Sequence, residues 1–169
     1  MMLALKRAGR PRHWLLAVAM GAALLAAGCS GSTSSRGDSS NSSRTVAIAA
    51  KRLAHAGTVL VNGQGYALYI FVPDGRKQVT CTGVCAATWP PVKLPSGAAL
   101  KAGPGVKSTL FGSDPDPEGG RVVTYAGWPL YTYTGDVQPG QDTGQGIDLN
   151  GGDWYLMRPS GAPLTASPS

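Results

Sequence analysis

Short apolar runs separated by turns rich in glycine and proline make up most of this 169-residue chain. The runs are three to seven residues long, and most are rich in the β-branched and aromatic residues typical of strands. No segment between them shows a convincing amphipathic helix. The sequence therefore predicts an all-β or mainly β domain, with strands at residues 45–50, 57–62, 66–72, 109–111, 121–125, 130–134 and 154–157.

The strand predicted at residues 66–72 is apolar on both faces. Tyr69 and Phe71 share one face, because successive side chains of a strand point to opposite sides. The other face carries Leu68, Ile70 and Val72. We therefore expect a central strand that is covered on both sides and ends at the turn residues 73–75.

The connections between the strands are expected to be irregular. Residues 62–65 predict a hairpin turn, and residues 95–105 predict an irregular crossing punctuated by Gly and Pro. A short helical turn is expected within residues 81–91, near the cysteine pair, where Ala86 and Ala87 allow it and two prolines end it. Loops are expected at residues 112–120 and 137–152, and residues 160–169 are expected to form a disordered tail.

One ten-residue segment occurs twice. Residues 65–74 (GYALYIFVPD) return 62 positions later as residues 127–136 (GWPLYTYTGD), and a tryptophan follows each copy, at Trp89 and Trp154. The recurring positions include the pairs Tyr69 and Tyr131, Phe71 and Tyr133, and Asp74 and Asp136. Recurrence at one offset indicates a duplication. We therefore expect a compact domain at residues 45–159, in which a pseudo-twofold axis relates two β repeats.

The first 28 residues have the organisation of an export signal. A basic segment, residues 1–13, precedes 14 apolar residues, too few to cross a hydrocarbon core of about 30 Å as a helix. The run ends at LAAGC, residues 25–29, which resembles the lipobox of bacterial lipoproteins and implies cleavage before Cys29 and its lipidation. The alternative is an ordinary secretory signal with an incidental cysteine. Residues 29–44, mostly Ser and Gly, then predict a lipidated cysteine on a flexible tether.

The chain is nearly neutral once the leader is set aside. From Cys29 onward it has 11 Lys or Arg against 9 Asp or Glu, a formal net charge of +2, whereas the whole chain carries +6. No run of basic residues follows the leader. We therefore expect no nucleic-acid partner.

The repeated segment resembles that of a family of bacterial secreted repeat lipoproteins with the pattern Y-x-[FWY]-x-x-D. The pattern stands here as YIFVPD at 69–74 and YTYTGD at 131–136, and CTGVCAATWPP at 81–91 matches the family's cysteine-rich signature. The loop 112–120 is longer and more acidic than the family's usual turn. The family is largely uncharacterised, and the resemblance implies for function only that some members are associated with envelope electron transport.

Cys81 and Cys85 are the cysteines that remain once Cys29 is lipidated. An export signal places them in an oxidising compartment, and a spacing of four on a helical turn brings them within disulfide reach. We expect a permanent brace in front of Trp89, worth about 2 kcal/mol in the chain-entropy model. The alternative is a redox or copper pair, since C-x-x-x-C resembles the spacing in copper-delivery proteins of cytochrome oxidase assembly. Such sites normally add a histidine, and the sequence does not place His55 near the cysteines.

The polar motif residues have two interpretations each. Asp74 and Asp136 follow predicted strands and are expected to fix turns, although a pair about the axis could also form a carboxylate site. The motif aromatics are expected to pack in the core rather than to form a platform for a quinone or a sugar. Two acidic groups lack the spacing of a calcium loop and are expected to be solvated turns: Asp114, Asp116 and Glu118, and Asp142, Asp148, Asn150 and Asp153.

No motif of a hydrolase, a zinc protease, a nucleotide-binding loop or a dinucleotide site occurs, so we expect neither an enzyme nor a cofactor. We expect instead a lipid-anchored protein at the extracytoplasmic face of the bacterial cell membrane, acting as a binding or interaction module. Its partners would be the membrane, through the anchor, and an envelope protein; the sequence names no small-molecule ligand. The alternative is an accessory to envelope electron transfer or copper handling through Cys81 and Cys85.

Overall fold

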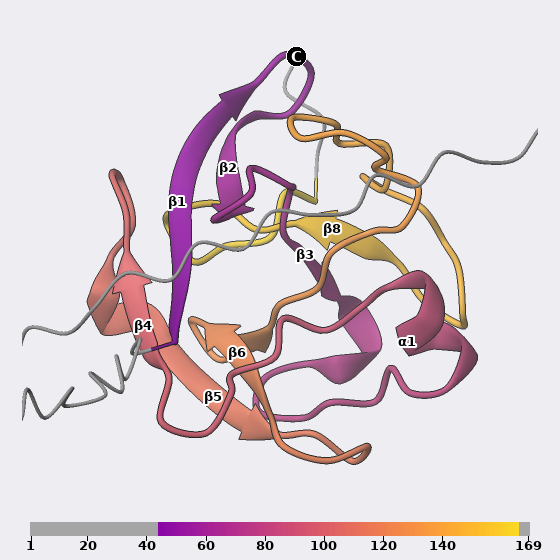
Figure 1. Cartoon of the computed structure of the whole chain (residues 1–169). Helices are drawn as coiled ribbons and strands as arrows, with labels where there is room; N and C mark the ends of the chain where they lie inside the picture. The colour runs from indigo at the N-terminus through magenta and orange to yellow at the C-terminus, as the bar shows by residue number, and fades with distance from the viewer. Residues whose placement is uncertain (1–43, 166–169) are drawn as a thin grey trace, which may run out of the picture. The chain divides into compact units, whose positions relative to one another are not determined.

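The computed structural model describes residues 44–165 (Figure 1). The predicted leader, Cys29 and nearly all of the predicted tether lie outside the described residues, as do residues 166–169. The described part contains eight strands, one short α-helix and two 3₁₀ turns, so it is mainly β, as predicted. Within it, no helix has the length and apolar character needed to cross a membrane.

The first sheet has the strand order β2–β1–β4 (Figure 1). Strand β1 (Thr45–Leu53) pairs antiparallel with β2 (Gly57–Asn62) and parallel with β4 (Ala99–Ala102). Strand β1 is longer than predicted, because Lys51 and Arg52 continue the pairing with β2. The irregular crossing predicted at residues 95–105 is wrong for its middle part, residues 99–102, which form a strand. There β4 pairs with the open edge of β1, a tertiary contact that the flanking Gly and Pro residues conceal.

Strand β3 (Tyr69–Phe71) pairs antiparallel with β8 (Trp154–Leu156). It is shorter than the strand predicted at residues 66–72, because Val72–Asp74 form a 3₁₀ turn, η1, around Pro73. Val72 is therefore 43% exposed, and the expectation that it is covered is wrong. The predicted turn at residues 62–65 is present, and the Asn62 side chain closes it by accepting two backbone N–H groups.

The third sheet has the order β5–β6–β7. Strands β5 (Phe111–Pro115) and β6 (Arg121–Tyr125) form the predicted hairpin, but β5 begins where the first predicted strand ends. The predicted strand at 109–111 lies mostly in a 3₁₀ turn, η2 (Ser108–Leu110), and the predicted loop at 112–120 is half strand. Asp116 makes the shorter turn feasible, because its carboxylate accepts the Glu118 N–H at 2.8 Å.

The strand predicted at residues 130–134 is wrong. Strand β7 (Trp128–Pro129) ends just before it, and Tyr131 then makes isolated bridges with Tyr69 and Pro91. The chain here crosses from β6 to β3, so no single neighbour runs beside it for several residues. An apolar pattern cannot reveal this change of partner.

Residues 160–165 are held by backbone pairing, with Gly161 and Leu164 buried, which contradicts the predicted disordered tail for that part of it. Met157 and Pro163 form a bridge, and the Leu164 N–H donates to the Leu156 carbonyl at 2.8 Å. Leu164 is 1% exposed. The returning chain thus pairs beside β8, which the proline- and serine-rich composition does not indicate.

Backbone hydrogen bonds relate the two repeats reciprocally. Tyr69 and Tyr131 exchange both of their N–H···O bonds, each at 2.9 Å. The flanking bonds form matched pairs: Leu60 N–H to Met157 O with Val123 N–H to Val92 O (both 2.8 Å), and Val72 N–H to Asp153 O with Thr134 N–H to Thr88 O (both 3.0 Å). An approximate twofold axis therefore passes between Tyr69 and Tyr131, as the duplication predicts.

The buried apolar side chains form two clusters, one on each face of β3. Tyr69 and Phe71 enter the first cluster, with the two motif tryptophans and the cysteines. Leu68, just before the strand, and Ile70 enter the second cluster, with residues of β1, β2 and β6. The strand at the axis is therefore covered on both sides, as its two apolar faces predict.

Candidate functional site

The repeat motif forms a pair of hydrogen bonds that cross between the repeats. The Tyr69 hydroxyl donates to Asp136 Oδ2 at 2.7 Å, and the Tyr131 hydroxyl donates to Asp74 Oδ2 at 2.5 Å. All four residues are buried. Each tyrosine therefore binds the aspartate of the other repeat rather than that of its own.

Each aspartate uses its second oxygen to hold the loop that follows it. Asp74 Oδ1 accepts from the backbone N–H and the hydroxyl of Thr80, at 2.7 and 2.6 Å. Asp136 Oδ1 accepts from the same two groups of Thr143, at 2.9 and 2.6 Å. With three donors each, the buried carboxylates are compensated by hydrogen bonds. Both aspartates thus anchor loops, which corresponds to the turn-fixing interpretation.

Burial raises the pKa of Tyr69 and of Tyr131 far above 10.0, the ordinary value for tyrosine. The hydrogen bonds to Asp136 and Asp74 raise each pKa further, because an ionised phenol would face a carboxylate. Both hydroxyls are therefore neutral donors at physiological pH. The Tyr69 hydroxyl also accepts the Gly144 N–H at 3.2 Å.

Four aromatic rings drawn from both repeats stack in one column. Trp89 and Trp154 lie parallel, with ring centroids 4.0 Å apart and 2° between their planes. Tyr133 stacks on Trp89 at 4.1 Å, and Phe71 stacks on Trp154 at 4.4 Å. Each tryptophan thus packs on the motif aromatic of the other repeat. All of these rings except that of Tyr133 are buried, so they fill the core, as the sequence analysis expects.

The disulfide distinguishes the first repeat from the second. Cys81 and Cys85 are bonded, as predicted, and Cys85 lies in the predicted helical turn, α1 (Val84–Thr88). Cys81 is 2% exposed and Cys85 is 9% exposed. Cys81 follows the loop threonine of its repeat, whereas Gly144 follows that of the other, where a Cβ would lie 2.8 Å from the Trp89 ring. At equivalent positions of the two repeats, the first therefore has a disulfide-bonded cysteine and the second has a glycine.

Two of the three acidic side chains in the first predicted group are engaged within the protein, and the third, Asp114, has a buried Oδ2 without a hydrogen-bond partner. Asp116 is buried, so the expectation of a solvated turn is wrong for it. Asp116 forms an ion pair with Lys93. Glu118 Oε1 accepts the Gly83 N–H at 2.6 Å, which links the β5–β6 hairpin to the loop of the disulfide. Among residues 44–165, no group of three or more His, Cys, Asp and Glu side chains is arranged to hold a metal.

The second acidic group is dispersed. Asp142 lies 3.6 Å from the His55 imidazole, measured from Oδ1 to Nδ1. The Tyr155 hydroxyl donates to Asp153 Oδ2 at 3.3 Å. The sequence left the position of His55 open, and the structure pairs it with Asp142 at the turn between β1 and β2.

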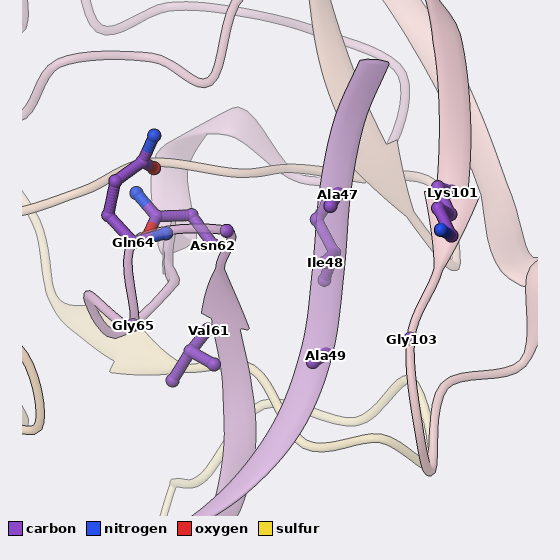
Figure 2. Close-up of a pocket in the computed structure, with 10 residues that line it drawn as sticks. Ala47, Ile48, Ala49, Val61, Asn62, Gln64, Gly65, Lys101 and Gly103 are labelled. Atoms are coloured by element: carbon purple, nitrogen blue, oxygen red, sulfur yellow. The ribbon is translucent and has the colours of Figure 1, made fainter.

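A groove of about 460 Å³ crosses one face of the β2–β1–β4 sheet. Its apolar lining comes from Ala47 and Ala49 of β1 and from Val61 of β2, which is the register partner of Ala49. Figure 2 shows Lys101 on one side of β1 and Gln64 on the other. The sequence did not predict this groove. Its signal was the pair of alanines at alternate positions of the first strand, which share one face.

We expect Tyr131→Phe to destabilise the domain by about 1–3 kcal/mol, because Asp74 stays buried and loses a donor. Tyr69→Phe should cost more, since the Gly144 N–H loses its acceptor as well. Urea unfolding of each variant gives the free energy. Tyr155→Phe is the control and should change stability by less than about 0.5 kcal/mol, because this half-buried side chain makes only a weak bond. Equal, small effects in all three variants would contradict the role assigned to the crossed bonds.

The raised pKa values also predict loss of stability in alkali. In the unfolded chain both phenols ionise near pH 10.0, whereas in the folded chain they resist ionisation. Their contribution to stability is therefore complete below pH 10 and is lost as the pH rises above it. We expect part of the tyrosinate absorbance to appear only together with the loss of near-ultraviolet circular dichroism. Complete ionisation of all tyrosines in a chain that keeps its circular dichroism would show that the two phenols are accessible.

A family model described as a secreted repeat of unknown function matches residues 53–93 and 114–157, which together make up half of the chain. Each matched segment contains one copy of the Y-x-[FWY]-x-x-D motif and the tryptophan that follows it. No curated protein and no solved structure matches the chain. The chain belongs to this secreted repeat family, as the resemblance in its motifs predicts.

Proposed function

We propose that the chain is a lipoprotein held by Cys29 at the extracytoplasmic face of the bacterial cell membrane, and that its β domain is a binding or interaction module. Membership of a secreted family supports export. The lipobox-like residues 25–29 support the anchor.

The main support for a binding role is that the side chains of the repeat motif interact with one another inside the domain. Each motif tyrosine donates a hydrogen bond to the aspartate of the other repeat. Phe71 and Tyr133 stack on the two tryptophans. The motif therefore builds the domain, and contact with other molecules falls to its surface. The groove on the β2–β1–β4 sheet has an apolar lining and polar rims, a combination that suits a binding site.

A non-catalytic role is part of the proposal. A general acid or base must have a proton or a lone pair that can reach the substrate. Asp74 and Asp136 are buried and each accepts three hydrogen bonds, while the tyrosine protons are donated to them. Neither pair is free to act on a bound molecule.

The alternative proposal, an accessory role in envelope electron transfer or copper handling, depends on Cys81 and Cys85. Burial of both cysteines within the first core cluster supports a brace instead. The two roles differ in how the disulfide is reduced. A brace resists mild reductant, whereas a redox pair is reduced and reoxidised near the potential of the envelope.

Metabolic labelling with a fatty-acid analogue, followed by mass spectrometry of the amino-terminal peptide, tests the anchor. We expect the native protein to begin at Cys29 and to carry the label. The Cys29→Ser variant should carry none, because the thioether and the new amino terminus are both lost.

The double variant Cys81→Ser/Cys85→Ser is the matched control. It removes the other two cysteines of the chain and should be labelled like the native protein. An amino terminus at any other residue, or label retained by Cys29→Ser, would overturn the anchor.

A further inference from the structure

The β2–β1–β4 sheet carries basic side chains and no acidic ones. Lys51 and Arg52 of β1 and Lys101 of β4 are exposed, and none of the three strands contains Asp or Glu. In the sequence, no acidic residue stands between Asp38 and Asp74. The near-neutral total after the leader therefore conceals a basic sheet, with the described acidic residues on other elements.

Two lysines flank the groove on this sheet. Lys101 lines it and is the register partner of Ala47 on β1. Lys51 stands four positions after Ala47, so its side chain lies on the same face. Its Nζ is 3.9 Å from where a Cβ on Gly65 would lie, and Gly65 also lines the groove. Figure 2 shows Gly65 and Lys101 on opposite sides of β1, so an ammonium group stands on each side of the groove.

Neither of these lysines has an acidic partner among residues 44–165. The ion pairs formed within that range are His55 with Asp142 and Lys93 with Asp116. Both lysines are exposed, and the Gln64 amide is a further polar group at the groove. Two unpaired ammonium groups beside an apolar lining are complementary to an anion that also has an apolar part.

We propose that this groove receives the headgroup of an anionic phospholipid, so that the β2–β1–β4 sheet lies against the membrane. The proposal rests on the proposed anchor at Cys29, which brings the domain to the bilayer. Among the described elements, β1 is the first after the proposed anchor. A chain of 15 residues, the number between Cys29 and Thr45, can span about 50 Å at most. The membrane surface is thus the nearest source of anionic headgroups. Each lysine near such a surface strengthens binding about fivefold.

The test uses the mature chain, residues 29–169, with Cys29→Ser and without the leader, so that no acyl chain contributes. Binding is measured by co-sedimentation with vesicles of phosphatidylglycerol and phosphatidylcholine, and with vesicles of phosphatidylcholine alone. We expect binding to the anionic vesicles that weakens as salt is added. Lys51→Gln/Lys101→Gln should weaken it about 25-fold, from two lysines at about fivefold each.

The charge-matched control is Lys77→Gln/Arg158→Gln, which removes two exposed cations outside the sheet. It should change binding by less than about threefold, because neither side chain belongs to β1, β2 or β4 or lines the groove. A second pair of variants adds a negative charge instead of removing positive ones. Gln64→Glu places a negative charge at the groove and should weaken binding, whereas Gln78→Glu places one on an exposed loop elsewhere and should not.

Equal loss of binding in the two double variants would overturn the proposal, since net charge alone would then explain the result. Equal binding to both kinds of vesicle, or none to the anionic vesicles, would overturn it as well. These outcomes do not depend on the acylation of Cys29, because the chain used has no cysteine there. The anchor and the docking face can therefore fail separately.

Discussion

The fold depends on two buried hydrogen bonds that neither repeat can form without the other. Tyr69 donates to Asp136 and Tyr131 donates to Asp74, and each aspartate then orders the loop of its own repeat. Removing either tyrosine hydroxyl while the repeats stay together would leave a buried carboxylate short of a donor, which is more costly than losing an exposed hydrogen bond. The exchange thus couples the interface between the repeats to the loops that follow them.

The twofold symmetry explains why the motif residues are structural. Features that depart from this symmetry are the candidates for a functional role. The aromatic column draws on both halves and the matched backbone bonds repeat in both, whereas the disulfide lies in the first repeat. The disulfide closes the loop that precedes Trp89. At the position equivalent to Cys81, the second repeat has Gly144, whose backbone lies against the Trp89 ring. The groove lies on β1, β2 and β4, and its lysines give one face of a nearly neutral domain a positive charge. We therefore propose that structure and binding depend on different residues.

The sequence predicted those features that depend on local chemistry or on recurrence. The duplication followed from Tyr69 and Tyr131 with their neighbours, and the disulfide followed from the spacing of Cys81 and Cys85 in an exported chain. The sequence did not predict that each tyrosine binds the aspartate of the other repeat, because partner choice across 67 and 57 positions depends on the assembled fold. Strand β4 and Leu164 were missed for a similar reason. Their pairing is set by open strand edges, and their own residues have weak strand preference.

Native-state hydrogen exchange at the Tyr69 and Tyr131 amides tests the central claim most directly. These two N–H groups donate to each other's residue across the axis, so they report on the interface itself. If the repeats are one cooperative unit, both amides exchange only through global unfolding and give the same free energy, equal to that from denaturant. Exchange of one of them through a smaller opening, while the other stays protected, would show that the repeats separate on their own and would contradict the account.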